Sequence, residues 1–203
     1  MTLSSTERDE IAATVRQAEA VTSAEIVVVV DRIAGSWRSW AMVVALIIAL
    51  ALPWPLIELT QFSTRTIFAT QILVAALLIV LFQRQPVRLK LALPMFRRRK
   101  AHETALREFA ARGLSATRDR TGVMIYVALA ERYAEIITDT GISAVIDDDT
   151  WRAQMSGLIA AIHRGELAQG LADTVHQTAR VLAPHFPPRG DDSDELDNKV
   201  VII

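Results

Sequence analysis

The sequence contains no cysteine, which excludes disulfide bonds and thiolate metal sites and fits a reducing compartment. It also lacks an excess of basic residues, because 22 Lys and Arg face 23 Asp and Glu, for a formal net charge of −1. A protein that binds nucleic acid through its phosphates needs a basic field, so we expect no nucleic-acid partner. The first ten residues are polar rather than apolar. We therefore expect no cleaved signal peptide there.

Two long stretches lack any charged residue, 39–57 and 66–83. Each is close to the roughly 20 residues that a helix needs to cross a bilayer. We predict a transmembrane hairpin over residues 36–83, with the first span ending near Pro53 and Pro55. The alternative is a pair of buried helices in a soluble protein, although such helices are rarely apolar on all sides over this length.

A basic segment without any acidic residue follows the second stretch, over residues 84–100. Its basic residues are Arg84, Arg88, Lys90, Arg97, Arg98, Arg99 and Lys100. The loop between the two stretches carries a single arginine, so the positive-inside rule places this segment in the cytoplasm. We predict a multi-pass protein of the plasma (inner) membrane, with both termini cytoplasmic and these residues at the lipid surface. The alternative is a cluster that sets topology and does nothing more.

The remaining sequence predicts one small α/β domain in two pieces, residues 1–35 and 101–188. In the first piece, a capping box from Ser4 to Glu7 begins an amphipathic helix. The β-branched run of residues 24–31 then predicts a central strand that is covered on both faces.

The second piece predicts a helix, two strands and two further helices. The helix ends at Gly113, and the strands cover residues 122–130 and 133–138. Asp149 is placed to cap the next helix, and the last one ends near Ala183. The rest of the chain, residues 189–203, is rich in acidic residues and is predicted to be disordered.

The predicted strands can form one sheet in spite of the hairpin, because a hairpin returns the chain to the side that it left. Strand 24–31 and strand 122–130 then pair in parallel through a right-handed crossover. Strand 133–138 follows a two-residue turn at Glu131-Arg132 and pairs antiparallel, with that turn read either as an ordinary exposed turn or as a docking contact. This topology collects acidic residues at the membrane-distal edge of the sheet. They are Asp119, Asp139, Asp147, Asp148 and Asp149.

Two consecutive segments carry a family resemblance. Residues 120–133 read Arg-Thr-Gly-Val-Met-Ile-Tyr-Val-Ala-Leu-Ala-Glu-Arg-Tyr, and residues 135–142 read Glu-Ile-Ile-Thr-Asp-Thr-Gly-Ile. This pattern resembles the TPM domain, a family named for a thylakoid lumen protein, a photosystem II repair protein and a worm receptor modulator. Strand 24–31, the two helices after Asp149 and the closing His185-Phe186-Pro187 fit the same pattern.

The resemblance implies a single TPM-like α/β/α sandwich, here interrupted by the two-helix transmembrane hairpin. It also implies weak phosphatase activity and calcium binding, which are described for some members and attributed to acidic residues at the sheet edge. Many relatives carry Asp-Asn-Gly where this chain has Arg120-Thr121-Gly122. Asp119 is then the nearest acidic residue.

The candidate chemistry of this edge is cation binding by carboxylates. Calcium takes several oxygen ligands, and Asp119, Asp139 and Asp147 are the predicted metal ligands. Asp148 or Asp149 is equally explained as a helix cap, and Asp139 as a turn residue before Gly141. Hydrolysis would need Arg120 to orient a phosphate and a metal-bound water to attack it.

Two functions follow as expectations. The first is a membrane-anchored binding or assembly module that acts near another membrane protein. The second is a calcium-dependent phosphatase acting at the membrane-distal acidic edge.

Overall fold

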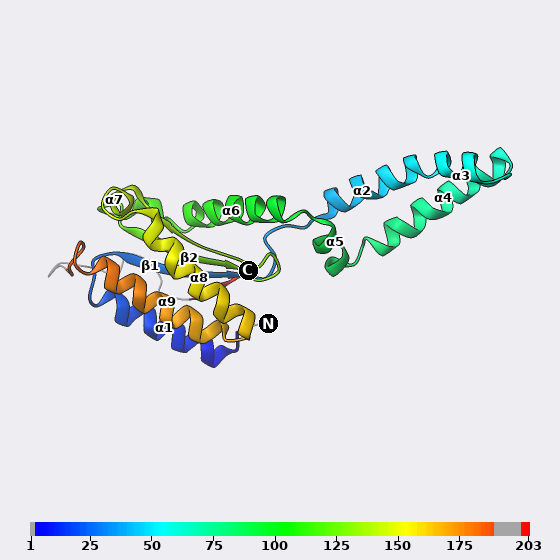
Figure 1. Ribbon diagram of the computed structural model, residues 1–203. Helices are drawn as coiled ribbons and strands as arrows, with labels where there is room; N and C mark the ends of the chain where they lie inside the picture. Colours follow the sequence, from blue (N-terminus) through cyan, green and yellow to red (C-terminus); the bar gives the residue numbers. More distant parts are fainter. Residues whose placement is uncertain (1–2, 189–199) are drawn as a thin grey trace. The chain divides into compact units, whose positions relative to one another are not determined.

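A computed structural model describes residues 3–188 and 200–203 of the chain. The chain divides into two units, which are considered separately below. One unit consists of Met1–Ala34 together with Arg98–Ile203, and the other is Gly35–Arg97. Figure 1 shows the elements of both.

The first unit is built on a four-stranded sheet with the order β3-β2-β1-β4. Strand β1 (Glu25–Asp31) pairs in parallel with β2 (Gly122–Ala128), and β2 pairs antiparallel with β3 (Tyr133–Thr138). Both pairings confirm the predicted topology. Every residue of β1 and β2 is buried, as expected for central strands that are covered on both faces.

Three helices cover one face of the sheet: α1 (Ser5–Glu19), α8 (Asp148–Arg164) and α9 (Leu167–Leu182). The predicted capping box is present, since the Ser4 hydroxyl accepts from the Glu7 amide while the Glu7 carboxylate accepts from the Ser4 amide. Apolar side chains of these helices pack against alternate residues of β1 and β2. The fully buried ones include Ile11, Val15, Leu158, Leu171 and Leu182.

Helix α6 (Pro94–Ala111) covers the other face. Its Ala101, Ala105 and Phe109 recur at helical spacing and pack against Val27, Val29, Met124 and Tyr126, which point away from the first core. Helices therefore lie on both faces of the sheet.

The fourth strand, β4 (Val201–Ile202), was not predicted. It pairs in parallel with Val29 and Val30 of β1, and the Ile203 amide donates to the Val30 carbonyl. The prediction of a disordered tail over residues 189–203 is therefore wrong for residues 200–203. Its acidic part, residues 189–199, lies outside the described residues.

The second unit contains two helical segments that are long and apolar enough to cross a membrane, Arg38–Leu59 and Thr64–Leu81. The first comprises α2 (Arg38–Ala51) and α3 (Pro53–Leu59), and the second is α4 (Thr64–Leu81). Pro53 does not end the first segment as predicted. It stands at the start of α3, where a helix needs no donor from it.

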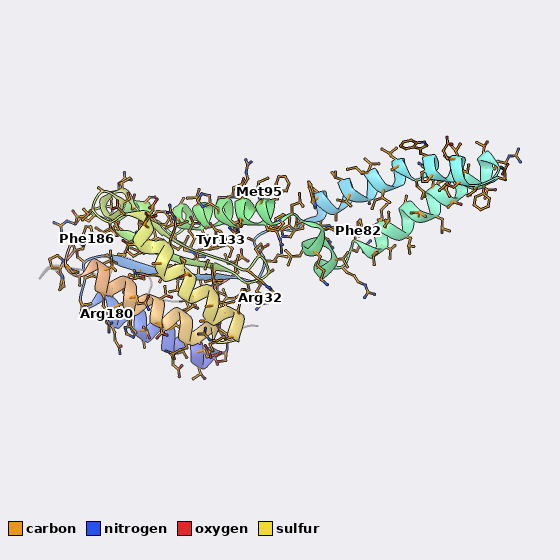
Figure 2. All side chains as sticks on the ribbon, in the orientation of Figure 1. Arg32, Phe82, Met95, Tyr133, Arg180 and Phe186 are labelled. Carbon is orange, nitrogen blue, oxygen red and sulfur yellow. The ribbon has the colours of Figure 1, made fainter. Side chains whose placement is uncertain are left out.

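The side chains of these segments project outward along both helices (Figure 2). The exposed ones include Leu46, Leu50, Leu73 and Leu77. Between the helices the packing is by small residues, since Ala41, Ala45 and Ala49 are the buried residues of α2. The Gln71 amide donates to the Ala49 carbonyl at 3.1 Å.

The basic segment begins with the short helix α5 (Gln85–Leu91). Arg88 of α5 ties the end of α4, because its guanidinium donates to the carbonyl of Phe82 at 2.6 Å and also to that of Gln83. It also reaches the Ser36 carbonyl at 3.3 Å. The Trp40 indole donates to the Leu91 carbonyl at 2.9 Å, so the start of α2 and the end of α5 are held together.

Candidate functional site

The predicted acidic edge lies where β1 and β2 begin and β3 ends. The amide of Asp139, directly after β3, donates to the carbonyl of Gly122 at 2.9 Å. At the start of β1, the Ser23 amide donates to the Phe186 carbonyl at 2.9 Å, which brings the closing His185-Phe186-Pro187 segment to the same edge. The topology therefore gathers distant parts of the chain here, as expected.

Two glycines allow the segment before β2 to pass close to its neighbours. A Cβ on Gly122 would overlap with the carbonyl oxygen of Leu114, and a Cβ on Gly141 would overlap with those of Asp119 and Arg120. The Gly141 amide donates to the Arg120 carbonyl at 3.1 Å. These contacts give a physical reason for glycine at both ends of the segment that carries the resemblance.

Arg120 adopts a backbone conformation that is unusual for its residue type, with φ +58°. Thr117 fixes the loop around it. The Arg120 amide donates to the Thr117 carbonyl at 3.1 Å, and the Thr121 amide donates to the Thr117 hydroxyl at 3.1 Å. The Arg120 guanidinium lies 3.8 Å from Oδ1 of Asp139. A strained backbone thus presents a cation to the end of β3.

Asp139 is buried with 7% of its side chain exposed, whereas 59% of the Arg120 side chain is exposed. Oδ1 of Asp139 accepts from the Thr140 amide at 2.7 Å, so the residue caps the one-turn helix α7 (Thr140–Ser143). Oδ2 is buried and has no hydrogen-bond partner among the described residues. Asp139 thus caps the turn that contains Gly141 through Oδ1, while Oδ2 takes no part in that cap.

Among the described residues, the other predicted metal ligands do not form a group of three or more with this carboxylate. Asp119 is exposed, and its backbone carbonyl lies close to Gly141. Asp147 is exposed and is the N-cap residue of α8, a position that the sequence assigned to Asp149. Asp149 lies in the first turn and pairs with Arg152 instead. Within residues 3–188 and 200–203, no three His, Asp or Glu side chains group in a way that could hold a metal ion.

A calcium ion would meet one buried carboxylate at this edge, and beside it a guanidinium of the same sign as the ion. Calcium takes six to eight oxygen ligands, so the described residues do not make a calcium site by themselves. The arrangement is an Arg–Asp ion pair with an exposed cation and a buried anion. An exposed guanidinium in such a pair has donors left with which it can bind a negatively charged group.

A second polar cluster, at the opposite end of β1, was not predicted. The Tyr126 hydroxyl donates to Oδ2 of Asp31 at 2.9 Å, and the Glu131 carboxylate accepts from the Ala34 amide at 3.1 Å. Glu131 is buried, so the turn that contains it is not an ordinary exposed turn. Burial raises the pKa of Tyr126, and the neighbouring carboxylate of Asp31 raises it further. The signal in the sequence was a tyrosine inside an apolar strand and an acid at the end of the adjacent one.

A third group joins α6 to the edge strand β3. The Nδ1 atom of His102 lies 2.9 Å from the Glu135 carboxylate, which also accepts from the Tyr133 hydroxyl at 2.8 Å. Burial and this hydrogen bond raise the pKa of Tyr133. His102 showed no motif spacing in the sequence, because its partners belong to a different element.

Comparison with known proteins agrees with this fold. Residues 91–181 match the family model described as the TPM domain. The structure is similar to the NMR structure of the BA42 protein from the psychrophilic bacterium Bizionia argentinensis, with a TM-score of 0.62 and 21% sequence identity. The alignment covers 100% of this chain and 97% of that one. No curated protein sequence matches the chain.

The family match is narrower than the resemblance predicted from the sequence. It begins at Leu91 in α5 and ends within α9, so α1 and β1 lie outside it. These two elements precede the apolar hairpin in the chain and yet complete the same sheet and core as the matched residues. The expected resemblance is confirmed, and the chain therefore contains a TPM domain.

Proposed function

We propose that this chain is a membrane-anchored TPM protein whose folded α/β unit serves as a binding or assembly module beside another membrane protein. The observation that carries the anchoring is the exposed apolar surface of the second unit. Large side chains such as Leu50, Leu73 and Leu77 are each more than 60% exposed there. A soluble protein seldom leaves so continuous an apolar surface uncovered, whereas lipid covers it without cost.

The charge distribution supports an orientation with both termini in the cytoplasm of a plasma (inner) membrane. Seven basic residues and no acidic ones occupy residues 84–100. The connection between the two apolar segments carries only Glu58 and Arg65. Such a bias favours a cytoplasmic position for the basic segment, at the surface of the lipid bilayer.

The absence of cysteine gives a direct test of this topology, since any introduced cysteine is the sole thiol. Gln61 lies exposed in the connection between the apolar segments, and Ser156 is exposed on α8. In intact spheroplasts, a membrane-impermeant maleimide should label Gln61→Cys at once and Ser156→Cys only after lysis. Labelling of Ser156→Cys in intact spheroplasts would show that the proposed topology is reversed. Recovery of the protein in the soluble fraction would contradict the proposed membrane anchor.

The binding role is supported by what the sheet edge presents. The exposed Arg120 is paired with the buried Asp139. Among the described residues, no cluster of carboxylates of the kind that a hydrolytic metal centre needs lies there. The test uses the other end of the sheet, where the turn at Glu131-Arg132 was read as a possible docking contact. A photo-crosslinking residue at the exposed Arg132 position should give a discrete adduct in living cells. That adduct should persist in an Asp139→Asn background. Loss of the adduct in Asp139→Asn would favour a role that depends on the carboxylate.

A calcium-dependent phosphatase at the same edge is the second candidate, and one observation favours it. Oδ2 of Asp139 is buried beside the exposed Arg120 and has no hydrogen-bond partner in the described part of the chain. Calorimetric titration with calcium and a phosphatase assay, on the detergent-purified protein, would test it. Saturable binding and turnover that are lost in Asp139→Asn and Asp147→Asn, and retained in Asp149→Asn, would establish this function in place of the binding module.

A further inference from the structure

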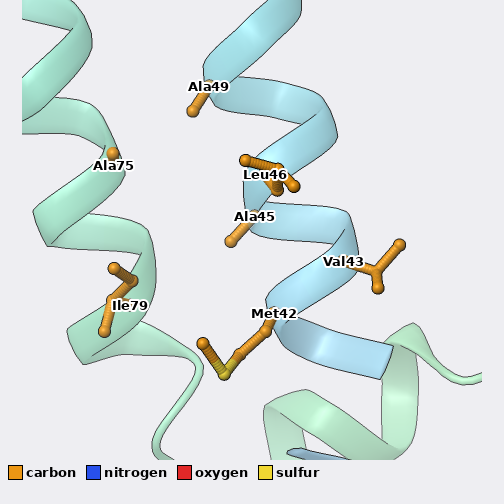
Figure 3. Close-up of a pocket in the computed structure, with 7 residues that line it drawn as sticks. All are labelled: Met42, Val43, Ala45, Leu46, Ala49, Ala75 and Ile79. Carbon is orange, nitrogen blue, oxygen red and sulfur yellow. The ribbon is translucent and has the colours of Figure 1, made fainter. Parts of the chain in front are cut away.

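An open groove runs between α2 and α4 of the second unit (Figure 3). The groove encloses about 290 Å³. Its lining residues are Met42, Val43, Ala45, Leu46, Ala49, Ala75 and Ile79. The side chains of Met42 and Ala45 point from α2 toward the helix that carries Ala75 and Ile79. The lining is almost wholly apolar, so only hydrocarbon can fill the groove without leaving a polar group unpaired.

The groove exists because alanines face each other where larger side chains would close the gap. Ala45 and Ala49 on α2 and Ala75 on α4 leave space that Met42 and Ile79 narrow only toward one end. In a bilayer an apolar gap of this kind does not stay empty, because lining atoms without neighbours lose their dispersion contacts. An acyl chain supplies those contacts.

Positive charge at one end of the groove favours an anionic headgroup. Arg38 precedes Met42 by four residues and Leu46 by eight, so it lies on the same face of α2, about 6 Å from Met42 along the axis. Arg84 follows Ile79 by five residues, at the corresponding end of α4. Both arginines are exposed.

No acidic residue competes for these arginines within residues 35–97 at this end of the hairpin. The only acid in that range is Glu58, which lies in α3 near the connection at the other end. Arg88 is already engaged with the carbonyls of Phe82, Gln83 and Ser36, and therefore ties the helix end. Of the other basic residues at this end, Lys90 lies in α5 and Arg97 in α6, so Arg38 and Arg84 are the cations that directly adjoin α2 and α4.

We propose that the groove between α2 and α4 binds an acyl chain of an anionic phospholipid, whose headgroup is held by Arg38 and Arg84. This site rests on the proposed membrane anchoring and adds a ligand class to it. Each basic side chain near the headgroup level contributes roughly fivefold in affinity, so two should favour an anionic over a zwitterionic headgroup by about 30-fold.

Native mass spectrometry of the full chain in detergent tests the headgroup. The added lipids are phosphatidylglycerol and phosphatidylcholine with identical acyl chains. The wild type should retain phosphatidylglycerol preferentially, and Arg38→Gln with Arg84→Gln should abolish the preference. Arg65→Gln, at the opposite end of the hairpin, is the matched control and should retain it. Equal retention of the two lipids by the wild type would overturn the proposal.

A pair of variants on one helix tests the groove. Ala75→Leu fills it and should reduce retention of both lipids, whereas Ala76→Leu places the same side chain on the exposed face of α4 and should not. If Ala75→Leu instead abolishes a dimer and leaves lipid retention intact, the occupant is a second copy and the lipid site is wrong. A protein that binds neither lipid but still sediments with membranes refutes this site and leaves the anchoring proposal standing.

Discussion

Gly141 owes its place to the carbonyl oxygens of Asp119 and Arg120, which occupy the space of a Cβ. Glycine is needed at position 141 because of close packing and not because of its backbone conformation. Among the described glycines, only Gly113 and Gly165 have a positive φ. The opposite holds for Arg120, which tolerates a left-handed backbone although a side chain is present. The close packing at Gly141 and the left-handed backbone of Arg120 therefore occur in adjoining loops. Together they bring Arg120 close to Asp139.

Gly141→Ala should lower the free energy of unfolding by about 1–3 kcal/mol, because backbone must shift to admit the methyl group. Gly157→Ala is the matched control. It lies within α8 with open space around it, so alanine there should raise stability by up to about 1 kcal/mol. Urea unfolding followed by circular dichroism would measure both, and equal effects would contradict the packing argument.

Tyr126 should make the stability of the protein fall at high pH. Its pKa is raised in the folded state, so the folded protein holds the phenolic proton when the unfolded chain has lost it. Stability from this group is complete below the ordinary tyrosine pKa of about 10 and declines as the pH rises above it. Unfolding free energies measured between pH 7 and pH 11 should show this decline.

Tyr126→Phe should weaken that decline and also lower stability at pH 7 by about 1–3 kcal/mol, because the buried Asp31 carboxylate loses a donor. Part of the decline should remain, since the pKa of Tyr133 is raised as well. An unchanged slope in Tyr126→Phe would assign the pH dependence to another group.

At the scale of elements, β4 is the shortest strand, and its two residues depend on pairing with β1 and on packing against the core. Among the described residues, Val201 and Ile202 pair with β1, and Val200 and Ile202 also pack against the core that includes α1, α8 and α9. The strand covers part of the outer edge of β1, which would otherwise expose unpaired amides and carbonyls. Two apolar side chains and a few hydrogen bonds are thus enough to order these last residues.

Ile202→Ser should therefore destabilise the α/β unit by about 1 kcal/mol, as expected for a partly buried side chain. Ile203→Ser is its control, since Ile203 is exposed and uses only backbone groups in the sheet. Hydrogen exchange at the Arg32 amide, which donates to the Ile203 carbonyl, should accelerate in Ile202→Ser alone. Similar exchange in both variants would mean that β4 is held by its backbone.

The elements differ in how far local sequence specified them. The capping box and the continuous apolar runs of β1 and β2 were sufficient, because propensity and pattern agree there. Strand β4 was missed because four residues after an acidic stretch carry no periodic signal. The Arg120–Asp139 pair could not be predicted from the sequence either, because it depends on contact between two loops and on the positive φ of Arg120. Among the described residues no three acidic or histidine side chains group as a metal site, and Asp147 occupies the N-cap position of α8 without a side-chain cap hydrogen bond.

At the scale of the whole molecule, the decisive question is what solvent surrounds the apolar helices. Leu73 is 69% exposed at the middle of α4. In water, Leu73→Arg would be harmless or beneficial, whereas at the centre of a bilayer an arginine costs about 2.5–3.5 kcal/mol. We expect Leu73→Arg to reduce the fraction of protein that resists alkaline extraction from membranes. Gln61→Arg in the connection should leave that fraction unchanged.

The insertion of Gly35–Arg97 within the sheet-forming unit sets an order on how the protein is made. Strand β1 is synthesised before the hairpin, its neighbour β2 follows roughly 90 residues later, and β4 comes after both. At about 5–20 residues per second, β1 waits roughly 5–20 seconds for its first partner. During that time the apolar helices leave the ribosome, while the buried run of valines has no sheet to join. The edge of β1 that later pairs with β2 is therefore unpaired for that interval, and the sheet can form only after the whole hairpin has been made.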